Sequence, residues 1–487
     1  MYTRLVLLLS ILTLMVITGQ AQLATAVASQ TPAATPPPVT MQMVKDIMPG
    51  ASGSDPDDFF NVNGILYFSA FDDAHGFELW RSDGTPTGTY MVADINPGLD
   101  HSHPTGMVAY SGYFNDSDFY FLARTDSSQP HQIWKSDGTA AGTVQAVAPV
   151  DTPRSLTVVG DTLYFFANDP LYGVELWANN GTYGGSWLVK DINPGSANGA
   201  DITQRPVALG NKLLFIANDG VHGIELWISD GTTAGTHLVK DIYPDSSNIG
   251  AWGYFVVWGG LAYFNGNDNQ FGGELWQTDG TSAGTVRVAA VSSSTGTPID
   301  ILGVSGGLLY FLGNSPAQLW VADGTDSGTR MVHDFSIQVQ YGSSLGATPF
   351  NNGYCFSYIG NRYDTGSFRE LWCSDGQTAV QLDIIPASDE EIWSAPAVLN
   401  DILYFAVEDD VHGVELWQSD GAVAGSQMVQ DINPAQYVGS VPGDLTVVNG
   451  RLFFVADDGT HGRELWLLSP SIQPPGQTNA YLPMIIR

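Results

Sequence analysis

The sequence predicts an all-β fold, a single closed β-propeller of about nine four-stranded blades. A Glu-Leu-Trp segment or close variant recurs along the whole chain at an average spacing of about 48 residues, the length of a propeller blade. Glycine (55 residues) and proline (27 residues) interrupt every segment too often for long helices. An eight-bladed ring with one divergent copy outside it, or an open β-solenoid, is the alternative. The tryptophans that mark the copies are Trp80, Trp134, Trp177, Trp227, Trp276, Trp320, Trp372, Trp417 and Trp466.

Each repeat predicts four short strands, named a to d in chain order. Strand a ends in a turn such as Asn449-Gly450, a pair that accepts the positive φ of a tight hairpin. Strand b is an apolar run such as 452–455, and a polar loop leads to the Glu-Leu-Trp strand, c. An Asp-Gly turn then leads to strand d, as in 238–242. Since successive side chains of a strand alternate in direction, Leu226 and Trp227 need cover on opposite faces, which neighbouring blades provide.

The two ends of the repeat region predict how the ring closes. The last copy stops after 464–468, so its blade lacks strand d. The segment 43–47 has the pattern of a strand d without a blade of its own. We therefore expect this N-terminal strand to complete the last blade.

The chain begins with a segment typical of an export signal. Arg4, an apolar run over 5–18 and the small residues 24–26 fit a cleavable signal peptide. The run is too short to cross a bilayer comfortably, which disfavours the alternative of a membrane anchor. The expected organisation is a signal peptide (1–26), a Pro/Thr/Ala-rich spacer (27–42), the propeller (43–468) and a C-terminal tail (469–487).

The charge of the chain narrows the range of partners. A formal net charge of −33 repels nucleic acid and anionic lipid, so neither is an expected partner. No segment after the signal approaches spanning length, so we expect no membrane insertion of the mature chain. The acidic surface suits cations, basic partners or solubility outside the cell.

Only two cysteines occur, and both fall in one predicted hairpin. Folding that hairpin about Asp364 places Cys355 opposite Cys373 on adjacent antiparallel strands. A cross-strand disulfide is the candidate, and two buried free thiols are the alternative.

The loops between strands b and c are the candidate ligand-binding sites. They combine carboxylates with a histidine, and a glutamate begins the strand that follows. In an antiparallel blade these b–c loops share one rim with the d–a connections, while the c–d turns share the other rim. The candidates are Asp72, Asp73, His75, Glu78, Asp219, His222, Glu225, Asp409, Asp410, His412, Glu415, Asp457, Asp458, His461 and Glu464.

Calcium is a candidate ion for these loops, since it prefers oxygen ligands. The twelve-residue Asp-x-Asp-x-Asp-Gly loop with its closing glutamate is absent, so repeated hairpin-turn chemistry is the competing explanation. The histidines recur at one loop position, whereas an active site needs unlike residues that converge once. We therefore expect each histidine to cap its own loop, assign no metal, and expect no other cofactor.

The Glu-Leu-Trp-x-x-Asp-Gly-Thr string, as at 225–232, resembles the ELWxxDGT repeat family of secreted bacterial proteins, also called hyalin-like. That family is defined by its repeat, so the resemblance implies no catalytic residues. Gln132 and Gln318 replace the glutamate in two copies, Asn180 replaces the turn aspartate, and the copy at Asp375 lacks its Gly-Thr continuation. The C-terminal tail is similar to the short Tyr-Leu-Pro-aliphatic-Arg endings of some secreted bacterial proteins; a frayed apolar terminus is the alternative.

The expected function is that of a secreted or surface-displayed, non-catalytic binding scaffold with a glycan or protein ligand outside the cell. No Gly-x-Ser-x-Gly, His-Glu-x-x-His or phosphate-binding loop is present, so an enzyme is the less favoured class. An extracellular polysaccharide hydrolase or lyase is one alternative, because a propeller channel can hold paired carboxylates. A structural or adhesive envelope component is the other. Ligand identity and oligomeric state stay open.

Overall fold

The computed structural model describes residues 38–470 except 110–117, 201–204, 245–248, 270–273, 292–298, 314–317, 336–338, 363–365, 383–390 and 436. All of these residues belong to one compact unit, Pro38–Arg487. The predicted signal peptide, most of the spacer and the tail from 471 onward lie outside the described residues. Among the residues described, no helix is long and apolar enough to cross a membrane.

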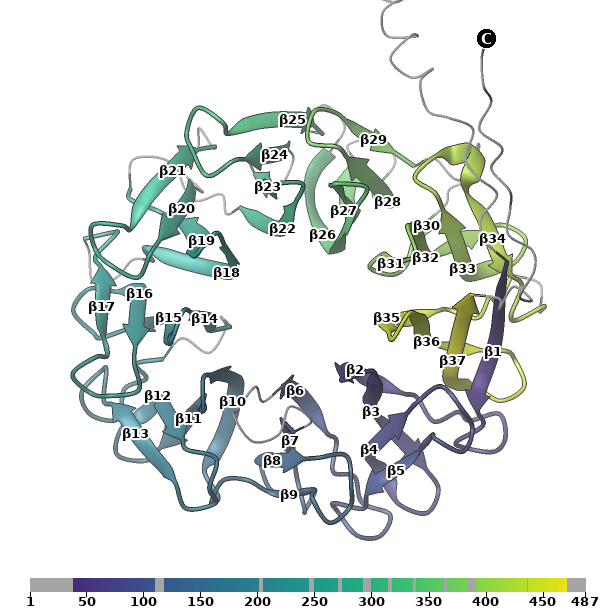
Figure 1. The fold of residues 1–487 in the computed structure, drawn as a ribbon, viewed down its shortest axis with the longest axis horizontal. Helices are drawn as coiled ribbons and strands as arrows, with labels where there is room; N and C mark the ends of the chain where they lie inside the picture. Colours follow the sequence, from purple (N-terminus) through teal and green to yellow (C-terminus); the bar gives the residue numbers. More distant parts are fainter. Residues whose placement is uncertain are drawn as a thin grey trace, which may run out of the picture. The chain divides into compact units, whose positions relative to one another are not determined.

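The described residues form nine antiparallel sheets that stand radially around a central axis (Figure 1). Blades 1 to 7 are β2–β5, β6–β9, β10–β13, β14–β17, β18–β21, β22–β25 and β26–β29; blade 8 is β30–β34, and blade 9 is β35–β37 with β1. The propeller of nine blades is therefore confirmed. The structure does not have the eight blades or the open solenoid of the two alternatives.

Within a blade the strands follow one another from the axis outward (Figure 1). The innermost strands are β2 (Asp57–Val62), β6 (Thr105–Ala109), β10 (Asp151–Val159), β14 (Val207–Leu209), β18 (Ala251–Trp258), β22 (Asp300–Ser305), β26 (Val339–Phe350), the pair β30 (Glu391–Ile392) and β31 (Ala397–Leu399), and β35 (Gly443–Val448). The strands b are β3 (Ile65–Asp72), β7 (Phe119–Ala123), β11 (Thr162–Asp169), β15 (Lys212–Asn218), β19 (Leu261–Gly266), β23 (Leu308–Gly313), β27 (Gly353–Arg362), β32 (Ile402–Asp409) and β36 (Arg451–Asp457).

The two outer positions hold the Glu-Leu-Trp strand and its partner. The strands c are β4 (Gly76–Ser82), β8 (Gln132–Ser136), β12 (Gly173–Asn179), β16 (Ile224–Ser229), β20 (Glu274–Thr278), β24 (Gln318–Ala322), β28 (Gly366–Ser374), β33 (Gly413–Ser419) and β37 (Arg463–Pro470). The strands d are β5 (Tyr90–Ala93), β9 (Val144–Gln145), β13 (Ser186–Lys190), β17 (His237–Lys240), β21 (Val286–Ala290), β25 (Arg330–Asp334), β29 (Ala379–Gln381), β34 (Gln427–Gln430) and β1 (Val39–Lys45), and a short 3₁₀ turn, η1 (Val423–Gly425), precedes β34.

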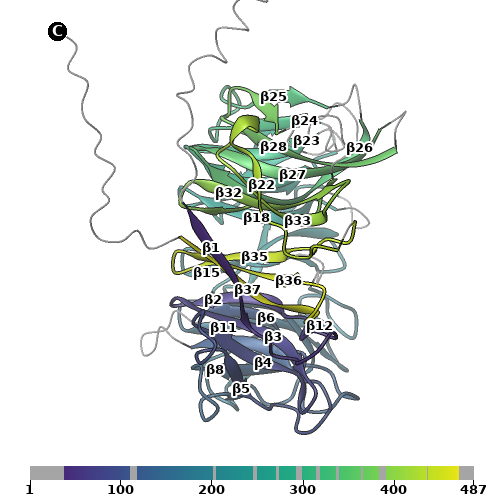
Figure 2. The ribbon, with the colours of Figure 1, turned by 90° about the vertical axis from the view of Figure 1, so that its right-hand side faces the viewer.

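The N-terminal strand completes the last blade, as the missing strand d predicts. β1 pairs antiparallel with β37, and the two lie side by side in Figures 1 and 2. β1 begins at Val39 and β37 ends at Pro470, so blade 9 extends beyond the expected propeller bounds (43–468) on both sides and takes in the last residues of the expected spacer (27–42). Val39 and Met41 pack on the core of blade 9, and Val39 pairs with Pro470, which extends the blade in both directions.

Each strand c contributes to two cores, as the alternation of side chains predicts. Leu79 packs with Phe119 and Phe121 of blade 2, whereas Trp80 packs with Phe453 and Leu465 of blade 9. The leucine face of a blade therefore meets the next blade, and the tryptophan face meets the preceding one. This direction matters below, because it tells which blade each side chain faces.

Lysines of strand d join successive blades on their outer side. Lys45 donates from Nζ to the carbonyl of Thr89 in the next blade (2.8 Å) and lies over the ring of Trp80, 5.8 Å from its centroid. A lysine that is both hydrogen-bonded and placed over an aromatic ring gains from both interactions. The equivalent contacts are Lys190 with Thr236 and Trp227, and Lys240 with Thr285 and Trp276.

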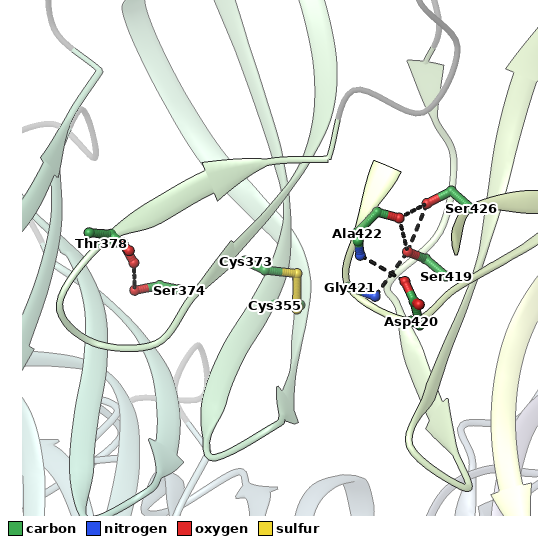
Figure 3. The surroundings of a disulfide bond; sticks show 9 residues. All are labelled: Cys355, Cys373, Ser374, Thr378, Ser419, Asp420, Gly421, Ala422 and Ser426. Atoms are coloured by element: carbon green, nitrogen blue, oxygen red, sulfur yellow. Dashed lines mark hydrogen bonds between the residues drawn. A yellow bond between two sulfur atoms is a disulfide. The ribbon is translucent and has the colours of Figure 1, made fainter. Parts of the chain in front are cut away.

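The c–d turns are closed by their own side chains. In blade 4, Asp230 Oδ1 accepts the backbone N–H and the hydroxyl of Thr232 (2.9 and 2.7 Å), and Ser229 Oγ accepts the N–H of Gly231 (3.0 Å). Gly231 has φ +87°, which favours glycine. Figure 3 shows the related turn of blade 8 between Ser419 and Ser426.

The irregular blade, blade 7, carries the disulfide. Cys355 pairs with Cys373 in the register of β27 and β28, and their sulfurs are bonded (Figure 3). Its c–d turn is shorter than the others: Ser374 Oγ donates directly to the carbonyl of Thr378 (2.7 Å). The disulfide lies beside this shortened turn, where the Gly-Thr continuation is missing.

Candidate functional site

The four b–c loops with a predicted histidine are each closed by an aspartate of the same loop. Asp72 Oδ1 accepts the backbone N–H groups of Ala74 and His75 (2.9 and 2.7 Å) and contacts Nδ1 of His75 (2.9 Å). The hydrogen bond to Asp72 raises the pKa of His75. These histidines therefore cap their own loops, as expected from their recurrence. The equivalent pairs are His222 with Asp219, His412 with Asp409, and His461 with Asp458.

The four predicted site glutamates at the starts of strands c have no exposed surface. Glu78 accepts the backbone N–H groups of Ile95 and Asn96 (2.8 and 3.2 Å) and the hydroxyl of Ser102 (2.7 Å). It thus ties its strand to the connection that leads to the next blade. Burial raises the pKa of Glu78 to about 7, although these hydrogen bonds lower it. Glu225, Glu415 and Glu464, the other predicted site glutamates, are equally buried.

The remaining candidates differ in their contact with solvent. Asp73 and Asp410 are exposed, while Asp457 accepts the N–H of Gly459 (2.7 Å). The predicted residues therefore lie in separate loops of four blades and do not converge. Across the described ranges, no group of three or more His, Cys, Asp or Glu side chains could hold a metal ion, and calcium stays a prediction.

Apolar side chains stand at the tips of three b–c loops. Leu171, Val221 and Val411 are 70%, 66% and 57% exposed. They occupy the same loop position, because the backbone N–H of each donates to an aspartate two residues earlier. Sequence reasoning did not single them out, although their place between the aspartate and the glycine of the loop could have done so.

A cavity of about 390 Å³ lies between blades 1 and 2. From blade 1 it is lined by Asp57, Asp58, Ser69 and Phe77. Asp57 pairs with Ser69 across β2 and β3, and directly paired residues share a face of the sheet. Ser69 in turn pairs with Leu79, so this is the face that meets blade 2.

Ser69 leaves room in this wall because its side chain is small. The strand-b residue that pairs with the leucine of strand c is Phe166 in blade 3, Ile216 in blade 4 and Val455 in blade 9. All three are buried and fill the space between blades. The same position holds Asn265, Ser357 and Ala406 in blades 5, 7 and 8, so a small residue here is shared with other blades and the cavity also depends on the wall that blade 2 provides.

On the blade 2 side, the cavity is lined by two histidines, His103 and His131, and by Thr105, which carries a hydroxyl. Burial lowers the pKa of both His103 and His131, so both are neutral near pH 7. Nε2 of His131 contacts the carbonyl of His103 (3.1 Å). The ring of His103 stacks on Phe77, with centroids 5.1 Å apart.

Asp58 carries the perturbed carboxylate of this cavity. Desolvation by the surrounding wall raises the pKa of Asp58, while a hydrogen bond from Thr105 and the charge of Arg205 lower it. None of the cavity residues was predicted from the sequence. No repeated pattern marks them, because the position of Ser69 varies among the blades, with Asn265 in blade 5 and Ser357 in blade 7.

No protein-family model matches the chain, and no curated protein matches it. Similar solved structures include puromycin hydrolase, with 13% identity over 83% of this chain and 58% of that chain and a TM-score of 0.37. Prolyl oligopeptidase B from Galerina marginata shows 10% identity over 72% of this chain and 55% of that chain, with a TM-score of 0.40. The chain thus spans little more than half the length of these structures. TM-scores of this size carry no argument about this chain.

Proposed function

We propose that this chain is a secreted or surface-displayed, non-catalytic binding protein that presents its b–c rim to a protein partner. The supporting observation is the repetition of exposed apolar tips at Leu171, Val221 and Val411. Single exposed aliphatic side chains are ordinary, and the proposal rests on their return at the same loop position of one rim in blades 3, 4 and 8. Aliphatic tips offer no hydrogen bonds to a sugar, so a protein is favoured over a glycan as ligand.

Most polar groups of the same rim already have partners within the chain, which leaves few of them for a ligand. The aspartates and histidines of the loops bond to one another, and the glutamates are buried. The tips and the exposed Asp73 and Asp410 therefore remain for a partner to contact. Export, membership of the ELWxxDGT repeat family and calcium binding belong to the same proposal, and N-terminal sequencing of protein recovered outside the cell tests the first.

The experiment compares two rims of the full chain. A variant with Leu171→Ser, Val221→Ser and Val411→Ser removes the apolar tips, while Tyr183→Ser with Val423→Ser changes exposed residues of the opposite c–d rim. Partners are identified by crosslinking on intact cells, and their affinity is measured with purified protein. We expect the tip variant to lose at least about tenfold in affinity and the control to lose none. Equal binding by both variants, or a glycan as the crosslinked ligand, would overturn the proposal.

A further inference from the structure

We infer that the cavity between blades 1 and 2 is a binding site for an organic cation, an alkylammonium or alkylguanidinium group. This site goes beyond the rim proposal, because it lies on different residues and is independent of the apolar tips. Its volume of about 390 Å³ is within the range of small-ligand pockets. Ser69 lines it with a small side chain at a position where blades 3, 4 and 9 carry Phe, Ile or Val.

The hydroxyl of Ser69 is available to a ligand. The residue is only 5% exposed and lines the cavity. Because buried polar groups are normally hydrogen-bonded, a ligand or water that enters the cavity can bond to this hydroxyl.

The charges around the cavity select a cation. Asp55 is balanced by Arg463, whose Nε lies 3.6 Å from its carboxylate. Asp57 and Asp58 remain, and the neutral histidines of the opposite wall add no positive charge. Asp444, in the neighbouring blade 9, adds a further negative charge near Asp57 and Asp58. The carboxylates outnumber the nearby Arg205 and Arg124, so the cavity is negative and a cation is attracted to it.

The other wall selects an organic cation over a bare metal ion. Phe77 and Pro104 give the cavity apolar surface, and an aromatic ring attracts a cation that carries alkyl groups. A metal ion would leave most of the volume and the apolar wall unused. A neutral ligand would remove water from Asp57 and Asp58 without supplying an opposite charge, which is costly.

The test uses the full chain and titrates n-butylammonium chloride by calorimetry, with n-butanol as the neutral analogue and sodium chloride as the salt control. Ser69→Ile should fill the cavity with the residue that blade 4 carries at Ile216, so this variant is expected to fold. Asp57→Asn removes charge and keeps the volume. Asp326→Asn, exposed in the c–d turn of blade 6, is the matched control.

We expect saturable binding of butylammonium that falls at least about tenfold in both cavity variants and is unchanged in the control. Equal binding of butanol, full competition by sodium chloride, or undiminished binding in Ser69→Ile would overturn the inference. The tip variant should bind butylammonium as the wild type does, because its substitutions lie outside the cavity. The two proposals can therefore be tested independently. Butylguanidinium and a peptide with an internal lysine then distinguish a free amine from a basic side chain as the source of the cation.

Discussion

Glu225 and Asp230 stand at the two ends of one strand, β16, and hence at opposite rims. Asp230 is exposed, and the hydrogen bonds from Thr232, first from its hydroxyl and then from its backbone, lower the pKa of this carboxyl. Glu225 has no exposed surface; burial raises its pKa to about 7, although it accepts the N–H of Tyr243. One repeat therefore uses a carboxylate at each end for different purposes: a local turn at one rim, and a link toward the next blade at the other.

This difference explains which departures from the repeat are tolerated. At the c–d rim Asn180 still accepts from the hydroxyl of Thr182 (2.7 Å), so the turn survives without the aspartate. At the b–c rim Gln132 replaces the glutamate of blade 2, and its amide both accepts from the N–H of Val150 and donates to its carbonyl (3.0 Å each). The replacement keeps the link between strand and connection.

The largest expected effect comes from the glutamate that joins the two ends of the chain. Glu464 accepts the N–H groups of Ile47 and Met48 and the hydroxyl of Ser54 (3.2, 3.0 and 2.6 Å). Glu464→Ala leaves these donors without their acceptor at a buried site, and we expect a loss of about 3 kcal/mol in the free energy of unfolding. Denaturant unfolding measures it, and hydrogen exchange should rise in β1.

The matched control is Glu78→Ala, which removes the equivalent acceptor inside the chain. It should cost a similar free energy and leave the exchange of β1 unchanged. If both variants unfold like the wild type, the buried carboxylates do not hold the connections.

A smaller effect is expected at the opposite rim. Asp230→Ala removes the acceptor of the turn, but water can replace it, so we expect a loss of about 1 kcal/mol in the free energy of unfolding. Asp230→Asn keeps an acceptor oxygen and should cost less. A loss as large as that of Glu464→Ala would remove the distinction between the rims.

The smallest expected effect is on the pH dependence of stability, which differs between the carboxyl groups of the two rims. The folded pKa of Glu78, Glu175 and Glu225 is about 7, above the ordinary 4.5, so their contribution to stability is full below about pH 4.5 and is lost as the pH rises through about 7. The pKa of Asp230 is lowered, so its contribution is present above the ordinary 3.8 and is lost as the pH falls through the folded value.

Melting temperature against pH, in enough salt to screen the general charge, measures these two opposite slopes. It should be highest at mildly acidic pH. Glu175→Gln should flatten the decline at higher pH, and Asp230→Ala should flatten the decline at lower pH. If Glu175→Gln leaves the fall in melting temperature between about pH 4.5 and 7 unchanged, the buried glutamates are not its cause.

Much of the fold follows from short-range patterns. The return of Trp80 and its equivalents predicts the number of blades, and the alternation of Leu79 and Trp80 predicts which residues face each neighbour. The pairing of Cys355 with Cys373 follows from hairpin register alone. The burial of the candidate glutamates was harder to predict. Glu78 begins a strand beside a polar loop, and it is the connection through Ser102, distant in sequence, that covers it.

The sequence by itself determined the repeat, the strand order, the N-terminal strand that completes blade 9 and the Asp–His loops, because each depends on residues close in the chain or on a pattern repeated along it. The tertiary structure decided which carboxylates are buried and where a cavity opens. Both depend on how adjacent blades meet: the cavity lies where Ser69 of blade 1 faces His103, Thr105 and His131 of blade 2. Packing between blades, and not the repeat, thus produced this cavity.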